Sequence, residues 1–386
     1  MSRRTFSLKK NEKNKVLVAL LMLLLWRISS AALHAEQSLS PVQASNVDAT
    51  VEMEMNREHV VGIAVGIIRN DDIVYLKGYG LADRENNIPV TTDTMFRWAS
   101  CTKPLTAIAA LQLAEKGRLD LDADVRRYVP EFPDKGVTIT ARELLCHESG
   151  IVHYSNGKVI VTRRRYDAPH PFADPVMALD TFKESPLLFR PGERFSYSSY
   201  GYILLSAVIE RAGRETFAAQ IVDRIARPLG MTTLQPDYEW VNIPNRAVGY
   251  QFESGSVVRS TDTDTSWKWG AGGYISDIRD FAVFAKALLE DKLVDEETQT
   301  EMWTPQKTLD GRLAKIGALD YGLGFEIQVS RTGQLIKVCH DGAQEKTRTR
   351  LVIYPGLRNG VVVMTNCEWV DPGIFSTLIY RALQKE

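Results

Sequence analysis

Ser100 and Lys103 are three residues apart, a spacing that places two side chains on one face of a helix. A serine hydroxyl is a weak nucleophile until a base takes its proton, and a partly buried lysine can be that base because burial disfavours its charged form. The pair therefore predicts acyl transfer at Ser100. The same spacing occurs at Ser7–Lys10, in a basic tail, and at Ser155–Lys158, which contains an Asn-Gly dipeptide typical of a loop.

The segment that follows Ser100 is expected to be a buried helix. Ser100 suits its N-cap, Pro104 falls in the first turn, where a missing N–H is tolerated, and Gly117 suits the end of the helix. Most positions between them are apolar: Leu105, Ile108, Ala109, Leu111 and Ala114. Lys103 opposes the positive end of the helix dipole, so helix stability does not explain it. The alternative is that Ser100 is only a cap and Lys103 only a solvated side chain.

Strand-like runs lie towards both ends of the chain. Val60–Ile68 and Ile73–Tyr79 are joined by four polar residues and predict a hairpin. Three more runs, with turns at Gly342 and at Pro355–Gly356, precede an apolar helix: Leu335–His340, Arg348–Tyr354, Gly360–Asn366 and the helix Gly373–Leu383. We therefore expect an α/β fold of the α+β type, in which both chain ends build a mostly antiparallel sheet flanked by helices.

A helical domain is expected to be inserted into this sheet domain. Residues 36–115 and 275–386 are assigned to the sheet domain, and residues 116–274 to the helical domain. Within the insertion, Pro191–Gly213 is typical of a turn followed by a helix, and Trp269–Tyr274 is typical of a flexible glycine loop.

Residues 1–35 have the order of an export signal. Basic residues come first, then an apolar run from Val16 to Trp26, then small residues up to Ala35. The run has 11 residues and is closed by Arg27, whereas a membrane-spanning helix needs about 20. We expect cleavage near Glu36, a periplasmic or extracellular location and no stable membrane insertion; an uncleaved anchor is the alternative.

The remaining composition excludes some classes of function. Removal of residues 1–35 would leave a net charge of −7, which argues against binding to nucleic acid. The four cysteines could pair in an oxidising compartment, but a chain of this length does not need disulfides, and Cys101 is expected to be a free, buried thiol. Since no His/Cys/Asp cluster has the spacing of metal ligands, no metal or other cofactor is expected.

Several segments together resemble serine hydrolases related to class C β-lactamases, penicillin-binding D,D-peptidases and their esterase relatives. The resemblance covers residues 50–380, and its landmarks are Phe96–Lys103, Leu144–Gly150, Pro191–Ser199, Gly272–Gly273 and His340–Gly342. It implies that Ser100 is the nucleophile, that Lys103 activates it, and that the partner is a small-molecule ester, amide or peptide.

The resemblance also implies a catalytic tyrosine. The literal Tyr-x-Asn pattern of the family occurs at Tyr154, but the turn and apolar helix around Tyr197 match the family's context better, so Tyr197 is assigned. Ser199 then stands where the family has Asn, and a hydroxyl lacks the donor pair of an amide. This departure bears on the positioning of amide substrates. An ordinary half-buried tyrosine is the alternative for Tyr197.

The third family motif, Lys-Thr-Gly in β-lactamases, is His340-Asp341-Gly342 in this chain. A histidine at this place is similar to what esterase and D-amino-acid peptidase relatives carry, and the resemblance implies that His340 is a catalytic residue. A neutral imidazole cannot supply the fixed cation that helps to hold a β-lactam's carboxylate. Gly342 is expected to let the strand approach substrate, and the backbone N–H of Ala343 would join that of Ser100 as an oxyanion hole. The other histidines considered are expected to be structural: His59, His147, His153 and His170.

These features predict an exported serine hydrolase that forms an acyl-enzyme at Ser100 and acts on small uncharged esters. Lys103 and Tyr197 are expected to share the serine proton, with Tyr197 held near its phenolate form as the base for deacylation. The alternatives are a D-amino-acid peptidase or D-aminopeptidase, and a β-lactamase, in which Arg348 or Lys346 would replace the missing cation. A noncatalytic penicillin sensor or scaffold is the alternative of another class.

Overall fold

The structure is a computed structural model that describes residues 38–384. A single compact unit begins at Pro41. The predicted export signal lies outside the described residues. Among the residues described, no helix has both the length and the apolar character needed to cross a bilayer.

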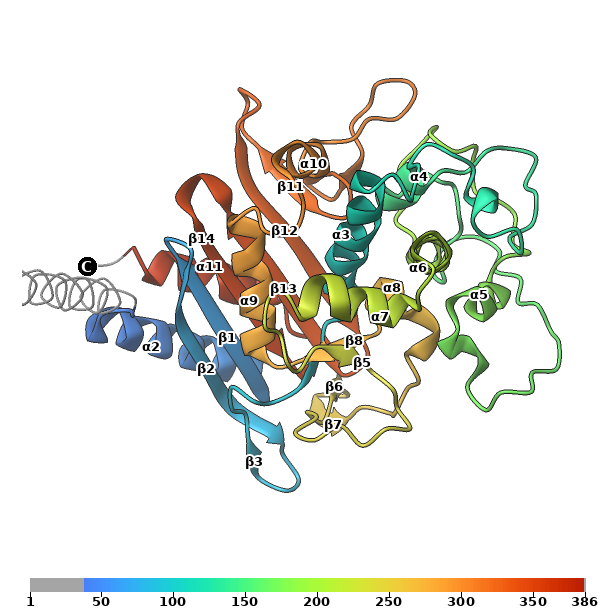
Figure 1. Ribbon diagram of the computed structural model, residues 1–386. Helices are drawn as coiled ribbons and strands as arrows, with labels where there is room; N and C mark the ends of the chain where they lie inside the picture. The colour runs from blue at the N-terminus through green and yellow to red at the C-terminus, as the bar shows by residue number, and fades with distance from the viewer. Residues whose placement is uncertain (1–37, 385–386) are drawn as a thin grey trace, which may run out of the picture. The chain divides into compact units, whose positions relative to one another are not determined.

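The core of the unit is an antiparallel sheet in which, within residues 38–384, nine strands follow the order β3-β2-β1-β14-β13-β12-β11-β10-β9 (Figure 1). Their bounds are β1 Gly62–Arg69, β2 Asp72–Asp83, β3 Ile88–Pro89, β9 Lys315–Ile316, β10 Leu319–Tyr321, β11 Glu326–Val329, β12 Leu335–Gln344, β13 Thr347–Tyr354 and β14 Asn359–Thr365. The first long strand pairs with the last, from Ile63 opposite Thr365 to Ile68 opposite Gly360. The expected sheet from both chain ends is confirmed.

The turns between these strands explain one success and one error of the sequence prediction. Asn70 and Asp71 join β1 to β2 with φ angles of 50° and 64°, the left-handed pair that a tight hairpin requires. The turn predicted at Gly342 is wrong, because β12 pairs with β13 as far as Gln344 opposite Thr347. The turn comes after Gln344, where Lys346 has a φ of 70°.

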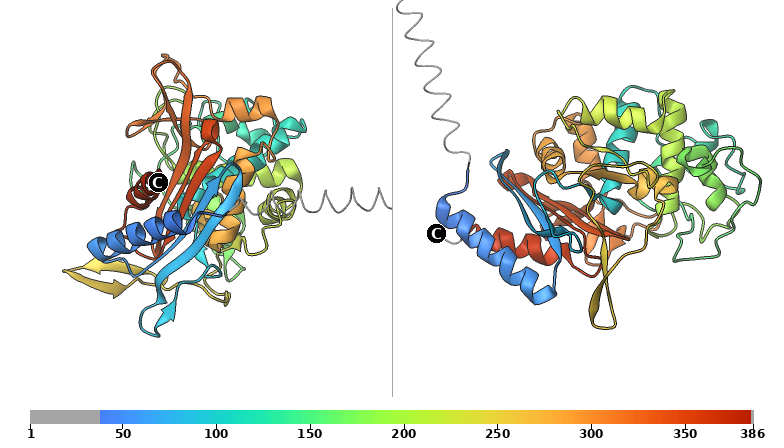
Figure 2. Two further views of the ribbon diagram at one scale, coloured as in Figure 1. Left: turned by 90° about the vertical axis from the view of Figure 1, so that its left-hand side faces the viewer. Right: turned by 90° about the horizontal axis from the view of Figure 1, so that it is seen from below.

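Helices cover both faces of the sheet (Figures 1 and 2). α2 (Pro41–Glu58) and α11 (Pro372–Ala382) lie together on one face, and α9 (Ile278–Leu289) lies on the other against β1 and β14. β1 is buried from Gly62 to Ile68, which explains its unbroken apolar run, since both of its faces are covered.

A helical layer lies beside α9 and centres on α3 (Thr102–Glu115), α6 (Ser199–Gly213) and α8 (Trp269–Gly272), which contact one another (Figure 1). α3 is buried at every position from Thr102 to Leu113, as its apolar sequence predicted. The flexible loop predicted at residues 269–274 is wrong, because these residues form buried α8 and the start of β8. The remaining elements are β4 Phe96–Arg97, α4 Ala141–Leu145, α5 Pro175–Ala178, α7 Phe217–Ile221, β5 Gln235–Pro236, β6 Tyr250–Glu253, β7 Ser256–Arg259, β8 Tyr274–Ser276 and α10 Glu296–Met302. The division into a sheet domain and an inserted helical domain stays a prediction.

Candidate active site

Ser100 lies in a 3₁₀ turn, Ala99–Cys101, that leads directly into α3. The predicted capping role of its side chain is wrong. The residue at the N-cap is Cys101, whose own backbone is already helical and whose side chain makes no capping hydrogen bond. The Ser100 hydroxyl instead lies 3.1 Å from Lys103 Nζ. It is therefore free of a structural role in the helix and available for chemistry.

The turn before Ser100 is strained. Ala99 has a φ of 47°, a conformation that is costly for a residue with a Cβ atom and that persists only where neighbours enforce it. Those neighbours hold Trp98, whose backbone N–H donates to Tyr274 O at 2.8 Å and whose carbonyl accepts from Thr349 Oγ1 at 2.8 Å. Hydrogen bonds from β8 and β13 thus fix the turn that carries Ser100.

Gly342 lets β12 approach this turn. A Cβ atom on Gly342 would lie 2.5 Å from Trp98 O and 2.0 Å from Thr349 Oγ1, so a side chain is excluded. The structure shows a close approach of Gly342 to the turn that carries the nucleophile, and its predicted approach to substrate stays a prediction. Cys101 Sγ donates to His340 O at 3.2 Å from the same turn, and Cys101 is a free, buried thiol as predicted.

Lys103 is fully buried, and its amine is surrounded by polar atoms. Nζ lies 2.9 Å from Ala271 O and 3.4 Å from Ser199 Oγ, besides its contact with Ser100. Burial, together with the charge of Lys268, holds the pKa of Lys103 well below its usual range. A neutral amine has two protons and one lone pair. The carbonyl of Ala271 can only accept a hydrogen bond, so one N–H of the neutral amine is directed to it, and the second N–H and the lone pair remain for the hydroxyls of Ser100 and Ser199.

Tyr197 completes the reactive cluster. Its ring centroid lies 4.7 Å from Lys103 Nζ, and its hydroxyl is hydrogen-bonded to Ser100. Burial raises the pKa of Tyr197 well above its usual range, although the bond with Ser100 opposes the shift. A raised pKa disfavours the phenolate form that was expected of Tyr197. The same desolvation favours the neutral amine and the protonated phenol, and which of the two acts as the base stays a prediction.

Ser199 and the rejected Tyr154 lie at the edge of this cluster. Ser199 begins α6, and its backbone N–H donates to His153 Nδ1 at 3.1 Å while its hydroxyl faces Lys103. The hydroxyl of Tyr154 bonds to Ser199, and its side chain is 52% exposed. Tyr154 therefore approaches the site through Ser199, whereas Tyr197 contacts Ser100 itself.

His340 is buried on β12 with both ring nitrogens in use. Nδ1 lies 2.7 Å from Asp341 O, and Nε2 lies 3.2 Å from the hydroxyl of Tyr321. Burial lowers the pKa of His340 to about 3, so the imidazole is neutral, as the sequence predicted. Ala343 follows on the same strand and is exposed. Its backbone role in an oxyanion hole stays a prediction.

Sequence reasoning missed two residues around this cluster, Tyr321 and Lys268, and gave His147 only a structural role. His147 and Tyr321 are buried beside Tyr197 and His340, with Tyr321 Oη 3.1 Å from His147 Nε2. Lys268, just before α8, acts electrostatically on Lys103. These residues lie far apart in the chain, so no local spacing could have linked them. His147 was the accessible signal, because it belongs to one of the landmark segments.

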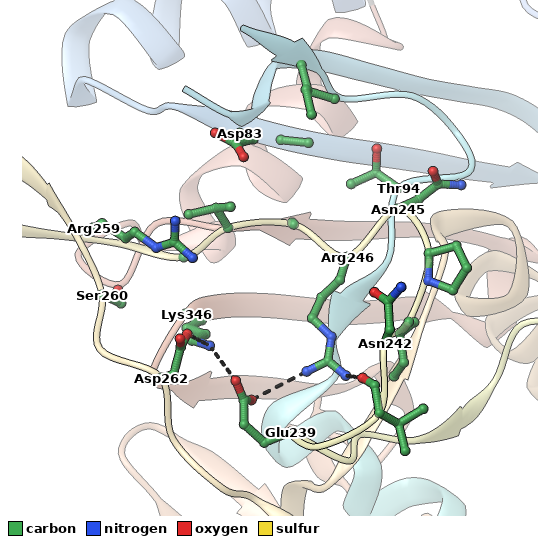
Figure 3. Close-up of a pocket in the computed structure, with 18 of the residues that line it drawn as sticks. Asp83, Thr94, Glu239, Asn242, Asn245, Arg246, Arg259, Ser260, Asp262 and Lys346 are labelled. Atoms are coloured by element: carbon green, nitrogen blue, oxygen red, sulfur yellow. Dashed lines mark hydrogen bonds and ion pairs between the residues drawn. The ribbon is translucent and has the colours of Figure 1, made fainter. Parts of the chain in front are cut away.

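A cavity of about 780 Å³ lies outside this cluster (Figure 3). Ser100, Lys103 and Tyr197 do not line it. Four of its charged side chains are paired with one another: Glu239 contacts both Lys346 and Arg246 at 3.4 Å, and Lys346 also pairs with Asp262. Lys346 therefore points into this cavity and cannot replace the cation that His340 lacks.

The second substitute cation considered, Arg348, is also engaged. Its Nη1 donates to the carbonyls of Gln344 and Thr347, both at 2.9 Å. Lys268 is less completely paired, because its nearest carboxylate, on half-exposed Glu345, is 3.6 Å away.

The chain is similar in sequence and fold to several known proteins. The family described as Beta-lactamase matches residues 47–372. The human serine beta-lactamase-like protein LACTB, mitochondrial, is 29% identical over 84% of this chain and 76% of its own length. The putative penicillin-binding protein PbpX of Bacillus subtilis is 31% identical over 68% of this chain and 61% of its own length. The octameric penicillin-binding protein homologue from Pyrococcus abyssi is 27% identical, with a TM-score of 0.73 over 88% of this chain and 77% of that chain.

Proposed function

Because this chain belongs to the Beta-lactamase family, and is on that ground a serine hydrolase in the broad sense, we propose that it hydrolyses small uncharged esters through an acyl-enzyme at Ser100. The observation that carries the proposal is the contact of Ser100 Oγ with a fully buried Lys103 amine at 3.1 Å. Burial makes that amine a proton acceptor at neutral pH, which an exposed lysine is not.

The first half of the reaction acylates Ser100. Lys103 Nζ takes the hydroxyl proton as Oγ bonds to the carbonyl carbon of the ester, and the negative oxygen accepts from the backbone N–H groups of Ser100 and Ala343. When the tetrahedral intermediate collapses, the carbon–alkoxide bond breaks. Tyr197, hydrogen-bonded to Ser100, gives its proton to the leaving alcohol and regains one from Lys103.

The second half releases the acid. Water attacks the acyl carbon, and its proton passes by way of Tyr197 to the Lys103 amine while Oγ leaves. Ser100 then recovers its proton from Lys103, so the enzyme returns to the neutral state in which it began. General acid–base help of this kind contributes about 10²- to 10⁴-fold to the rate.

The preference for uncharged esters rests on the missing cation. His340 is neutral, with a pKa of about 3, and Lys346 is held by Glu239 and Asp262. A substrate carboxylate would therefore find no permanent cation at position 340 of β12 to accept it.

A second candidate is a D-amino-acid peptidase or amidase, and Lys268 is the observation that favours it. Its side chain is 11% exposed and lies 3.6 Å from Glu345, so the pair could receive the two charges of an amino-acid substrate. Measurement of kcat/KM for a nitrophenyl ester, a D-amino-acid nitroanilide and a chromogenic cephalosporin, in wild type and in Lys268→Met, separates the candidates. The ester proposal predicts that the ester is the best substrate and that, at a pH where Lys103 is unprotonated in both proteins, Lys268→Met changes its kcat/KM by less than about threefold; a D-peptidase would lose its nitroanilide activity.

The noncatalytic alternative is tested by covalent labelling. A fluorophosphonate probe followed by peptide mapping should place the tag on the peptide that contains Ser100. Absence of labelling on folded protein would contradict the proposed hydrolase and favour a sensor or scaffold.

We also propose export, on the order of basic, apolar and small residues in positions 1–35. N-terminal sequencing of the protein recovered from cells should find a start near Glu36 outside the cytoplasm. A start at Met1 would contradict cleavage.

A further inference from the structure

Tyr321 lies between two histidine rings beside the reactive cluster. Its hydroxyl is 3.1 Å from His147 Nε2 and 3.2 Å from His340 Nε2. All three side chains are at most 1% exposed. They come from different parts of the chain, namely β10, the segment after α4, and β12. In the mechanism above, neither Tyr321 nor His147 touches substrate.

The two ends of this chain of contacts are backbone groups with fixed roles. The N–H of Ser198 donates to His147 Nδ1 at 3.1 Å, and His340 Nδ1 lies 2.7 Å from Asp341 O. A backbone N–H can only donate, and a carbonyl oxygen can only accept. Nδ1 of His147 therefore carries no proton, whereas Nδ1 of His340 carries one.

These ends determine every proton between them. Both rings are neutral, because burial lowers the pKa of each, and a neutral imidazole has a single proton. His147 must donate from Nε2 to the Tyr321 oxygen, and His340 Nε2 must accept from the Tyr321 hydroxyl. The hydroxyl of Tyr202 donates to Leu145 O at 2.8 Å. Its oxygen is a second acceptor for the hydrogen of the Tyr321 hydroxyl. It leaves both histidine tautomers unchanged.

This ordered chain joins two parts of the site. Ser198 directly follows Tyr197, whose ring centroid lies 4.2 Å from that of His147. At the other end, Asp341 precedes Ala343 on β12 by two residues. We propose that Tyr321 is a positioning residue for acyl transfer, which holds the segment of Tyr197 at a fixed distance from the strand of Ala343.

The inference rests on the proposed function and changes the part given to His340. Both of its nitrogens are engaged by Tyr321 and by Asp341 O, so it has no lone pair or proton free for substrate. His340 is then a second positioning residue rather than a carrier of protons. The sequence of the family motif alone does not make this distinction.

The test is Tyr321→Phe, which removes the hydroxyl and keeps the ring. The matched control is Tyr274→Phe, since Tyr274 is also fully buried and its hydroxyl has no partner among the described residues. For a nitrophenyl ester we expect kcat of Tyr321→Phe to fall about ten- to hundredfold at unchanged KM, because small misplacements of reacting groups are costly. The control should stay within about twofold. Rates are normalised to folded protein measured by circular dichroism.

Nitrogen NMR of histidine-labelled protein supplies a readout that is independent of activity. In wild type we expect the proton of His147 on Nε2 and that of His340 on Nδ1, with neither ring titrating between about pH 5 and pH 8. Tyr321→Phe removes the hydroxyl that donates to the lone pair of His340 Nε2. Because that hydrogen bond forms only with the neutral ring, the pKa of His340 should rise when it is lost. The opposite tautomer of either ring in wild type, or a Tyr321→Phe kcat equal to the control's, would overturn the proposal. Wild-type protein with these tautomers but no labelling of Ser100 would overturn the proposed function, and the positioning role in acyl transfer with it.

Discussion

The Ser100 cluster and the large cavity deal with charge in opposite ways. In the cluster, burial shifts the pKa of Lys103, Tyr197 and His340 towards their neutral forms. In the cavity, Lys346 and Arg246 are each paired with carboxylates. The turn after β12 contributes to both regions, because Glu345 pairs with Lys268 near the site whereas Lys346 points into the cavity.

This difference in charge distinguishes the reactive cluster from ion pairs that only stabilise the fold. A neutral amine beside a hydroxyl can accept a proton and return it, whereas a buried ion pair cannot change its protonation without leaving a partner charge unpaired. The cavity is the roomier region, but its charges are committed to structure. Arg97 illustrates this role, because it lies three residues before Ser100 and is anchored by Asp237 at 2.5 Å and Glu239 at 2.9 Å.

The largest effect should come from removing the base. Lys103→Met should lower kcat for an ester by about 10²- to 10⁴-fold, with no loss of stability, because the substitution replaces a desolvated amine with an apolar side chain of similar length. Lys346→Met, in the cavity, should keep kcat within about twofold. Steady-state kinetics on both variants tests the contrast. Equal losses in the two variants would remove the distinction between the regions.

The next largest effect should be on stability alone. Asp237 is fully buried and pairs with both Arg97 and Arg246. Asp237→Asn leaves two cations without their full partner, so we expect the free energy of unfolding to fall by about 3–5 kcal/mol. Urea denaturation measures this loss, and kcat per folded molecule should be unchanged. A variant of normal stability and impaired kcat would mean that the ion pairs of Asp237 with Arg97 and Arg246 serve the chemistry.

Variants of Tyr197 and Tyr154 test which of the two tyrosines takes part in catalysis. Tyr197→Phe should lower kcat by about two orders of magnitude, because its hydroxyl contacts Ser100 and carries the proton. Tyr154→Phe should have a small effect, because its hydroxyl reaches only Ser199. The comparison uses the same ester and the same pH for both variants. If Tyr154→Phe were the more damaging change, the literal Tyr-x-Asn match would be the correct one.

The parts of the fold that could be predicted are those that depend on short sequence patterns. The hairpin of β1 and β2, the buried α3 with its end at Gly117, and the sheet built from both chain ends follow from patterns of a few residues. Gly342 shows where such patterns fail, because a glycine that opens a turn and a glycine that admits a neighbouring backbone look the same. Only the contact with Trp98 O distinguishes them.

For the site, the sequence could indicate which residues react but not their protonation. Ser100, Lys103 and Tyr197 were assigned from spacing and resemblance, and the structure brings them together. The neutral state of Lys103 depends on the surrounding helices and on Lys268, and the phenol of Tyr197 stays protonated for the same reason. The hydrogen bonds of Tyr321 join β10 to β12 and to the segment after α4, which meet only in the folded protein.

The pH dependence of Ser100 acylation tests the central claim, that a neutral Lys103 activates the serine. A neutral fluorophosphonate, followed by intact-protein mass and mapped to Ser100, gives the rate constant without a need for the natural substrate. Since acylation requires the unprotonated amine, the rate should rise as pH passes the lowered pKa of Lys103 and be flat well before the usual lysine value of 10.5, and Lys103→Met should lack this rise. A rate that climbs up to the usual lysine pKa, or an unchanged profile in Lys103→Met, would contradict the account.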